Sequence, residues 1–275
     1  MKKISIIGNG FVGNAIYEGI KDYYKTFSYD KDQSKRINTL LECSQSDFFF
    51  ICVPTPSSYA GEFDLSYVKS AMSMLKSDKI IIIKSTITPE AAQELVDSFP
   101  NYRVVFNPEF LTERTAVEDF KNQRRIVLGG NKKDTEEVKR MYQKIFPDCE
   151  YILTDHKTSC FIKYFCNCFF ACKVSMMNEF YQIAEKENIC WDTSLKGLLL
   201  SGWVNPMHTL VPGPDGYLGF GGKCFPKDVL AFESYAKKIG VDPKILSASW
   251  KKNLEVRDDK NWEDIEGAVK KLDKL

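Results

Sequence analysis

The sequence has almost no net charge and no long uninterrupted run of apolar residues. Its 275 residues include 38 Lys and Arg against 37 Asp and Glu, a formal charge of +1. It therefore lacks the basic excess of proteins that bind nucleic acid through its phosphates. No apolar run approaches the roughly 18 residues of a membrane-spanning helix. We expect neither a nucleic-acid nor a membrane partner, whereas a local pocket for a small anion is compatible with this balance.

Cys-X-X-Cys pairs are also absent, although the sequence has nine cysteines. The odd number and the apolar surroundings of most of them suit small buried side chains in a reducing cytosol. The densest group consists of Cys160, Cys166, Cys168 and Cys172. Its spacing is not typical of a zinc site. The sequence therefore predicts a cytoplasmic protein without a bound metal.

The first ~150 residues alternate short β-rich runs with helical patterns. Strands are expected at Lys3–Ile7, Thr26–Asp30, Phe48–Val53, Ile80–Lys84, Arg103–Phe106 and Arg125–Leu128. Helices are expected near Phe11–Tyr24, Leu65–Leu75, Pro89–Phe99 and Lys133–Ile145. Continuously apolar strands are typical of a parallel sheet that is covered on both faces. The pattern predicts an α/β fold with a doubly wound, Rossmann-type sheet over residues 1–155.

Residues 156–275 show a different pattern and are expected to form a smaller all-α domain. Thr158–Glu187 contains no strong helix breaker and is apolar nearly all round, so this helix is expected to be buried in a domain or between two subunits. The stretch Asn205–Gly222 is rich in Pro and Gly, which indicates a functional loop. Further helices are expected at Lys227–Lys238, Pro243–Asp258 and, as a short charged helix, Trp262–Leu275.

A glycine-rich turn follows the first expected strand. The motif Gly8-Asn9-Gly10-Phe11-Val12-Gly13 is G-x-G-x-x-G and opens a helix. Its glycines permit a tight turn, close approach of a pyrophosphate and close helix–strand packing. Asp30 ends the next strand, where a carboxylate binds ribose hydroxyls and repels a 2′-phosphate. NAD is therefore favoured over NADP, a preference that nearby Lys31, Lys35 and Arg36 weaken.

A second unusual segment, Gly219–Asp228, carries Cys224 between a glycine loop and two lysines. Cationic neighbours and a helix N-terminus lower the pKa of a thiol and make it a nucleophile. Pro226 suits the first turn of a helix that begins there. Asp228 lies one turn beyond Cys224, so both side chains can face one site.

Together these residues resemble the UDP-glucose/GDP-mannose dehydrogenase family. The resemblance rests on motifs in the family's order, spread over residues 1 to about 258. They are the glycine turn, Ile51–Pro56, Lys84-Ser85-Thr86, Asn107–Glu113, Lys163 with Asn167, Asn178-Glu179 and Gly219–Asp228. The resemblance implies NAD-dependent oxidation of the C6 alcohol of a nucleotide sugar to a carboxylate. It also implies a thiohemiacetal and then a thioester on Cys224, and a homodimer formed through the long helix.

The resemblance also implies roles for individual residues. The implied catalytic residues are Cys224 as nucleophile, Lys163 and Asn167 at the oxyanion, Asp228 and Thr86 at the water, and Glu109 for acid–base work. The implied cofactor contacts are Gly8, Asn9, Gly10, Phe11, Val12, Gly13, Asp30, Lys35, Val53, Pro54, Thr55, Ser85, Thr86 and Glu113. The implied substrate contacts are Glu109, Phe110, Leu111, Lys163, Asn167, His208, Phe220, Gly221 and Cys224. His208 stands where the family usually has an arginine that reaches the partner's site.

The sequence departs from the family in one large respect, because the family's third, nucleotide-binding domain is not expected within these 275 residues. Substrate identity is therefore less defined than the chemistry, and a smaller substrate remains open. Two alternatives also remain open. A two-electron 3-hydroxyacid-type dehydrogenase would use a helix lysine and asparagine but has no use for Cys224. A non-catalytic nucleotide-binding relative would leave the Cys, Lys and Asp side chains idle.

Overall fold

The computed structural model describes residues 2–270, and its contacts divide the chain into two compact units. Unit 1 comprises the chain up to Thr55 together with Asp64–Lys163. Unit 2 comprises the short segment Pro56–Phe63 and the chain from Tyr164 onward. The long helix α7 (His156–Lys186) begins in unit 1 and continues into unit 2.

Unit 1 is built on a seven-stranded sheet. Its strands are β1 (Lys3–Ile7), β2 (Lys25–Tyr29), β3 (Phe48–Ile51), β5 (Ile80–Ile83), β6 (Arg103–Phe106), β7 (Arg125–Gly130) and β8 (Glu150–Thr154). Their order is β2-β1-β3-β5-β6-β7-β8, and all neighbours are parallel except β6 and β7. The predicted α/β fold with a parallel-dominated sheet is confirmed.

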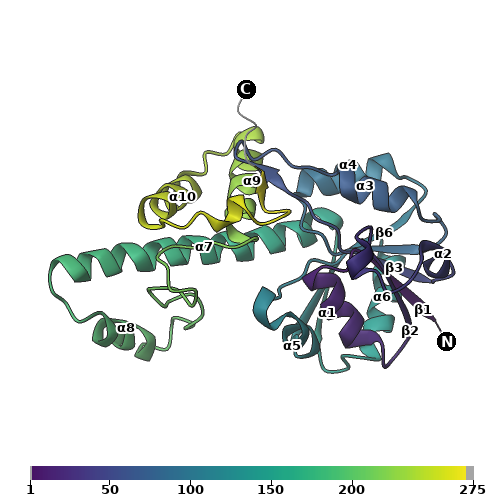
Figure 1. The fold of residues 1–275 in the computed structure, drawn as a ribbon, viewed down its shortest axis with the longest axis horizontal. Helices are drawn as coiled ribbons and strands as arrows, with labels where there is room; N and C mark the ends of the chain where they lie inside the picture. The colour runs from purple at the N-terminus through teal and green to yellow at the C-terminus, as the bar shows by residue number, and fades with distance from the viewer. Residues whose placement is uncertain (1, 271–275) are drawn as a thin grey trace. The chain divides into compact units, whose positions relative to one another are not determined.

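Helices cover both faces of this sheet (Figure 1). On one face lie α1 (Phe11–Ile20), α5 (Ala116–Lys121) and α6 (Lys132–Gln143), which share a core with Phe48 and Phe50 of β3. On the other lie α3 (Ser66–Ser73) and α4 (Pro89–Ser98), and α2 (Leu40–Cys43) is a single short turn. Every residue of β3 and β5 is buried, which is why both strands are apolar without alternation.

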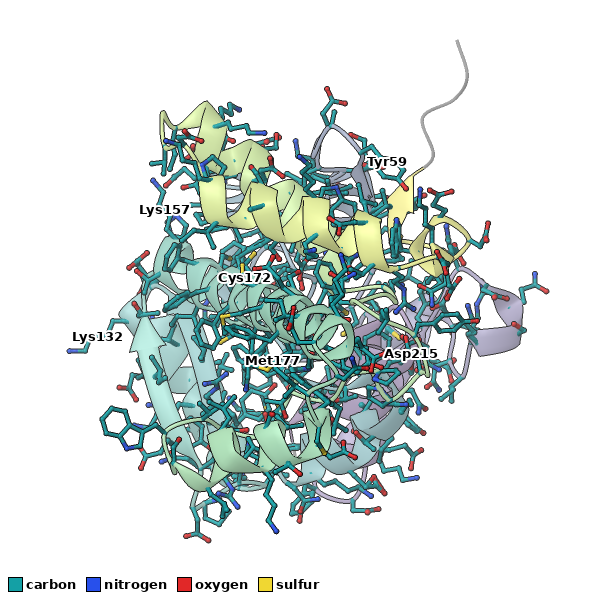
Figure 2. The ribbon with its side chains drawn as sticks, turned by 90° about the vertical axis from the view of Figure 1, so that its left-hand side faces the viewer. Tyr59, Lys132, Lys157, Cys172, Met177 and Asp215 are labelled. Carbon is teal, nitrogen blue, oxygen red and sulfur yellow. The ribbon has the colours of Figure 1, made fainter. Side chains whose placement is uncertain are left out.

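Unit 2 is mainly helical. From Tyr164 onward α7 packs with α9 (Phe225–Lys238) and α10 (Lys244–Val256) around a core that includes the fully buried Trp262. Figures 1 and 2 show α10 and α8 (Trp191–Leu200) on opposite sides of α7, which carries the labelled Cys172 and Met177. The predicted long helix and the helices that follow the Gly- and Pro-rich loop are therefore present.

The expected helix Trp262–Leu275 is wrong over its described part. A 3₁₀ turn (Asn261–Glu263) is followed by β9 (Val269–Lys270), which pairs in parallel with β4 (Ser57–Ser58). The turn buries Trp262 against Trp250 at a ring-centroid distance of 5.5 Å, a contact that outweighs the weak helix preference of a charged segment. Residues 271–275 lie outside the described part of the chain.

The apolar stripe of α7 is partly exposed on a single chain. Large apolar side chains along it, Phe165, Phe169, Met176, Phe180 and Ile183, are each at least half exposed. By length and composition alone α7 could also cross a membrane, although the core helices of water-soluble proteins meet the same criterion and 44% of its most apolar window is buried. The stripe therefore marks a face that this chain alone leaves uncovered.

Candidate active site

The glycine turn after β1 has the geometry that a dinucleotide needs. Gly8 has a φ of +96°, and its N–H donates to the Tyr29 carbonyl at 2.9 Å. A Cβ on Gly13 would lie 1.9 Å from the carbonyl oxygen of Gly8, so only glycine permits this approach. A Cβ on Gly10 would meet nothing within 4 Å, which leaves open space where the backbone faces a pyrophosphate.

Asp30 lies directly after β2, beside the glycine turn. Its two carboxylate oxygens accept N–H groups from Asn9 at 2.6 Å and from Asp32 at 2.9 Å. Each oxygen keeps lone-pair capacity for a ribose hydroxyl. The Oδ1 atom of Asn9 is buried without a hydrogen-bond partner, and Lys35 is exposed and pairs with Asp32. These residues fit the NAD that the sequence predicts.

The ends of β3 and β5 supply the next predicted cofactor contacts, Val53, Pro54, Thr55, Ser85 and Thr86. The Ser85 hydroxyl donates to the Val53 carbonyl at 2.7 Å, and the Thr55 hydroxyl donates to the Thr86 carbonyl at 2.7 Å. In doubly wound sheets ligands bind beside the carboxyl ends of parallel strands. These two hydrogen bonds hold the loops that follow β3 and β5 together at the carboxyl edge of the sheet.

Glu109 and Lys163 form a buried ion pair in unit 1, with Lys163 Nζ 3.0 Å from Glu109 Oε1. The other carboxylate oxygen accepts the N–H of Leu111 at 2.7 Å. Burial alone would raise the pKa of Glu109, but the charge of Lys163 and these hydrogen bonds leave it below its usual value. Phe110 lies against the same ammonium, at 5.5 Å from ring centroid to Nζ, whereas Glu113 is exposed. Glu109 is therefore held ionised beside the Lys163 ammonium.

A neighbouring buried network was not assigned any role from the sequence. Lys84 Nζ donates to Asn107 Oδ1 at 3.1 Å, and the Tyr142 hydroxyl donates to the same oxygen at 2.7 Å. Asn107 Nδ2 donates in turn to the Val127 carbonyl. Burial lowers the pKa of Lys84 to about 8. The network fixes Asn107, two positions before Glu109. The only signal in the sequence was that Lys84 and Asn107 are the first residues of two of the quoted motifs.

Replacing Lys84 by Met is expected to stabilise the protein at pH 7 and to do so less at high pH. A fall in pKa from 10.5 to about 8 corresponds to about 3 kcal/mol at ~1.4 kcal/mol per unit. At a pH between about 8 and 10.5, Lys84 is protonated in the unfolded chain but not in the folded protein. The free energy of unfolding of the wild type therefore rises with pH over this range. Urea unfolding of both proteins from pH 7 to pH 10 measures the difference. A difference that stays constant with pH, as expected for the exposed control Lys76→Met, would contradict this assignment.

In unit 2, Cys224 is the N-cap residue of α9 and its carbonyl accepts the N–H of Asp228 at 2.9 Å. The Asp228 carboxylate is buried, and each of its oxygens accepts a hydrogen bond. Asn167 Nδ2 donates to one oxygen at 2.6 Å and Lys227 Nζ to the other. By contrast, burial raises the pKa of Cys52 and of Cys160 to about 12, which makes both thiols poor nucleophiles. Cys224 thus stands one helical turn before a carboxylate that Asn167 and Lys227 hold in place.

The substrate contacts predicted in unit 2 lie around the same helix start. His208, with a φ of +63°, lies between the rings of Phe170 and Phe225 at centroid distances of 4.8 and 5.3 Å. Burial, and then the charge of Lys173, lower the pKa of His208, so the imidazole is neutral at pH 7. Phe220 is buried, and Gly221 precedes Cys224 by three residues. Within residues 2–270 no group of three or more His, Cys, Asp or Glu side chains could hold a metal.

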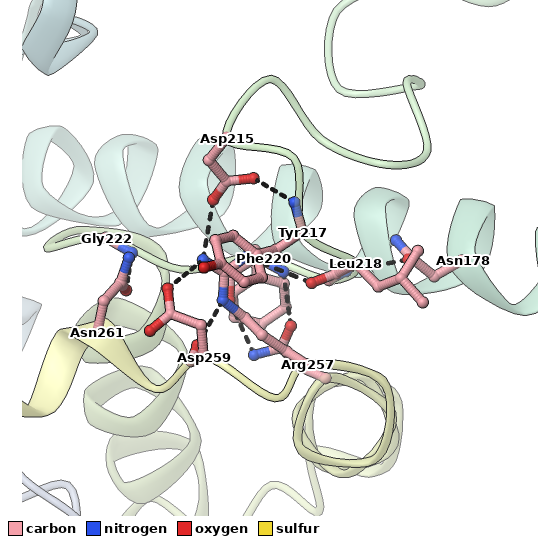
Figure 3. Close-up of polar contacts among 11 residues, drawn as sticks. Asn178, Asp215, Tyr217, Leu218, Phe220, Gly222, Arg257, Asp259 and Asn261 are labelled. Atoms are coloured by element: carbon pink, nitrogen blue, oxygen red, sulfur yellow. Dashed lines mark hydrogen bonds and ion pairs between the residues drawn. The ribbon is translucent and has the colours of Figure 1, made fainter.

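The side chains that hold residues 215–222, the loop before Cys224, were not assigned a role from the sequence. Figure 3 shows Asn178, Arg257 and Asn261 among the residues that contact residues 215–222 of this loop. Asn178 belongs to a quoted motif, which was its only signal. Arg257 and Asn261 gave no signal, because their contacts with the loop join residues about forty positions apart in the sequence.

Two family models match the chain. The model "UDP-glucose/GDP-mannose dehydrogenase family, NAD binding domain" matches residues 18–146, and the model for the central domain of the same family matches residues 157–255. The first match confirms the prediction of NAD as the cofactor.

Known proteins also resemble this chain in sequence or in fold. A UDP-glucose 6-dehydrogenase of Rickettsia bellii is 36% identical over 251 residues, covering 87% of this chain and 57% of the relative. The chain thus spans slightly more than half the length of that relative. A UDP-glucose dehydrogenase structure from Pyrobaculum islandicum matches with a TM-score of 0.82 at 24% identity, covering 93% of this chain and 68% of that one. A 3-hydroxyisobutyrate dehydrogenase of Mycobacterium tuberculosis shares the fold, with a TM-score of 0.72 at 16% identity and coverage of 94% and 95%. By both family models, the chain belongs to the UDP-glucose/GDP-mannose dehydrogenase family.

Proposed function

We propose that the chain catalyses the NAD-dependent oxidation of a nucleotide-sugar C6 alcohol, as in UDP-glucose, to the carboxylate. The observation that carries this proposal is Cys224 at the start of α9, one turn before an Asp228 carboxylate that Asn167 and Lys227 hold. A two-electron alcohol dehydrogenase has no use for this arrangement. NAD would supply the hydride acceptor, and two NAD molecules in succession would take up the two hydrides that the full oxidation releases.

In the proposed mechanism Cys224 retains the substrate carbon between the two oxidations. The thiolate Sγ attacks the carbonyl carbon of the intermediate aldehyde, a C–S bond forms, and the carbonyl π electrons move to oxygen to give a thiohemiacetal. The second oxidation leaves a thioester on Cys224. Water then adds to the thioester carbon, the C–S bond breaks, and the thiolate leaves as the carboxylate is released.

The surrounding side chains stabilise charge and move protons. Lys163 and Asn167, four residues apart on α7, are the proposed donors to the oxygen of the thiohemiacetal. The ionised Glu109 is the proposed base that takes a proton from the attacking water. Asp228 and Thr86 are the proposed pair that orients that water. The glycine turn, Asp30, Lys35, Val53–Thr55, Ser85 and Glu113 are the proposed cofactor contacts.

The remaining predictions stay proposals as well. Residues 1–155 are proposed as the cofactor domain and 156–275 as the helical domain, in a cytoplasmic protein without nucleic-acid or membrane partners. The exposed stripe on α7 supports a homodimer, since burying it stabilises an assembly. Replacing Phe169 and Phe180 by Glu is expected to yield monomers in light scattering. A wild-type protein that is itself monomeric would contradict the dimer.

Product stoichiometry tests the proposed activity directly. The purified chain is mixed with NAD and a panel of nucleotide sugars led by UDP-glucose, and NADH absorbance is followed alongside product analysis. Two NADH per carboxylate are expected, because an alcohol-to-acid oxidation releases four electrons. One NADH per turnover, with an aldehyde or ketone as the product, would favour a two-electron dehydrogenase instead. NAD binding without turnover on any sugar would favour the alternative that the chain is a non-catalytic nucleotide-binding relative.

A further inference from the structure

The loop that leads to Cys224 is held mainly by side chains of other elements of unit 2 (Figure 3). Gly219 N–H donates to Asn178 Oδ1 at 3.0 Å, and Gly222 N–H donates to Asn261 Oδ1 at 2.9 Å. Between them, Asn253 binds both the N–H and the carbonyl of Phe220, at 2.6 and 3.0 Å. Gly219 and Gly222 have positive φ values. The loop shape therefore depends on these partners.

Arg257, at the end of α10, completes this set of partners. Its side chain is fully buried. The guanidinium donates to the Leu218 carbonyl at 3.3 Å and to Asp215 Oδ2 at 2.8 Å. It also donates to the carbonyl and the carboxylate of Asp259, at 2.8 and 3.3 Å. These acceptors surround the planar guanidinium on several sides and so fix its position. A lysine ammonium, a compact charge on a flexible stem, could not be fixed in this way.

The guanidinium lies directly against Gly221, three residues before Cys224. A Cβ built on Gly221 would lie 2.4 Å from an Arg257 terminal nitrogen and 2.5 Å from its central carbon. A flexible side chain could normally move away, but the acceptors on Leu218, Asp215 and Asp259 hold this one. The backbone at Gly221 therefore rests on a rigid, charged surface.

We propose that Arg257 is a positioning residue for Cys224, acting through the Gly219–Gly222 turn. The inference rests on the proposed function, in which Cys224 is the nucleophile. By holding the turn against α10, Arg257 keeps Cys224 at the N-terminus of α9, where the helix favours a thiolate. Loss of the guanidinium removes the support behind Gly221 and is expected to shift the thiol from that position.

Alkylation of the full-length protein by iodoacetamide at pH 7, followed by peptide mass spectrometry, tests this inference without any turnover. The exposed Cys190, at the start of α8, serves as the internal reference. In Arg257→Met the Cys224-to-Cys190 rate ratio is expected to fall at least about tenfold, within the range by which local charge and helix ends tune thiolates. Arg257→Lys is expected to restore part of the ratio, and the exposed control Lys251→Met to leave it unchanged.

Gly221→Ala provides a second test if Arg257→Met does not fold, because its Cβ displaces the same guanidinium. It is expected to lower the ratio as well. A fast wild-type Cys224 with an unchanged ratio in both variants would overturn the role of Arg257. A wild-type Cys224 that reacts no faster than the buried Cys52 and Cys160, whose thiol pKa values burial raises to about 12, would instead count against Cys224 as the nucleophile, and so against the proposed function itself.

Discussion

Replacing Cys224 by Ser is expected to abolish carboxylate formation while NAD binding persists. A serine hydroxyl at the same helix start is far less acidic than a thiol, so the aldehyde cannot be retained as a covalent adduct. The expected loss is at least about 10⁴-fold in acid production, the scale seen when an enzyme loses its nucleophile. The glycine turn and Asp30 belong to unit 1 and are unaffected.

Product analysis and NAD titration measure the two expectations separately. Cys190→Ser is the matched control, since Cys190 is exposed and lies at the start of a different helix. It is expected to retain full activity. Full acid production by Cys224→Ser would refute the covalent mechanism, and loss of NAD binding would indicate that the substitution acts on more than the nucleophile.

Replacing Lys163 by Met is expected to lower both stability and activity. Its ammonium is the charged partner of the buried Glu109 carboxylate, and removing one member of a buried ion pair costs about 3–5 kcal/mol because the other charge stays unpaired. As a proposed donor to the oxyanion, its loss is also expected to reduce kcat by about 10²–10³-fold. Urea unfolding and steady-state kinetics measure the two effects.

The double variant Lys163→Met/Glu109→Gln separates stability from catalysis. Without the unpaired carboxylate, the free energy of unfolding is expected to recover most of the loss, since a neutral amide is less costly to bury. Activity is expected to stay low, because both proposed catalytic groups are missing. A double variant as unstable as Lys163→Met, or one that regains activity, would contradict this account of the pair.

Much of the fold could be predicted from the sequence because its strands are buried on both faces. Runs such as Ile80–Ile83 leave no polar face, and the structure places them in the middle of the sheet. The edge strand β8 is only partly buried, and the antiparallel pairing of β6 with β7 has no local signature in the sequence. The final 3₁₀ turn and β9 depend on the burial of Trp262 and on a partner strand far away in the sequence, which no local pattern reveals.

The candidate site likewise contains residues that could be predicted from the sequence and residues that could not. Glycine spacing and an acidic residue after β2 predicted the cofactor turn, because each requirement is local and steric. The setting of Cys224 marked it as a candidate nucleophile, whereas the roles of Lys163 and Asp228 came from resemblance. The structure adds that Lys163 pairs with Glu109 and Lys227 with Asp228. Lys84 and Arg257 escaped assignment because their roles follow from burial and from acceptors elsewhere in the chain, Asn107 for Lys84 and Asp215 and Leu218 for Arg257. Such contacts become visible only once the chain has folded.

The segment Pro56–Phe63 has a consequence for how the chain acquires its structure. It belongs to unit 2, although the sequence before and after it belongs to unit 1, and its strand β4 pairs with β9 about two hundred residues later. A fragment beginning at Tyr164 would lack that strand, so unit 2 is not an autonomous segment that can be excised. Pairings of such high sequence separation slow folding. During synthesis, unit 2 cannot be completed until β9 has left the ribosome, long after β4.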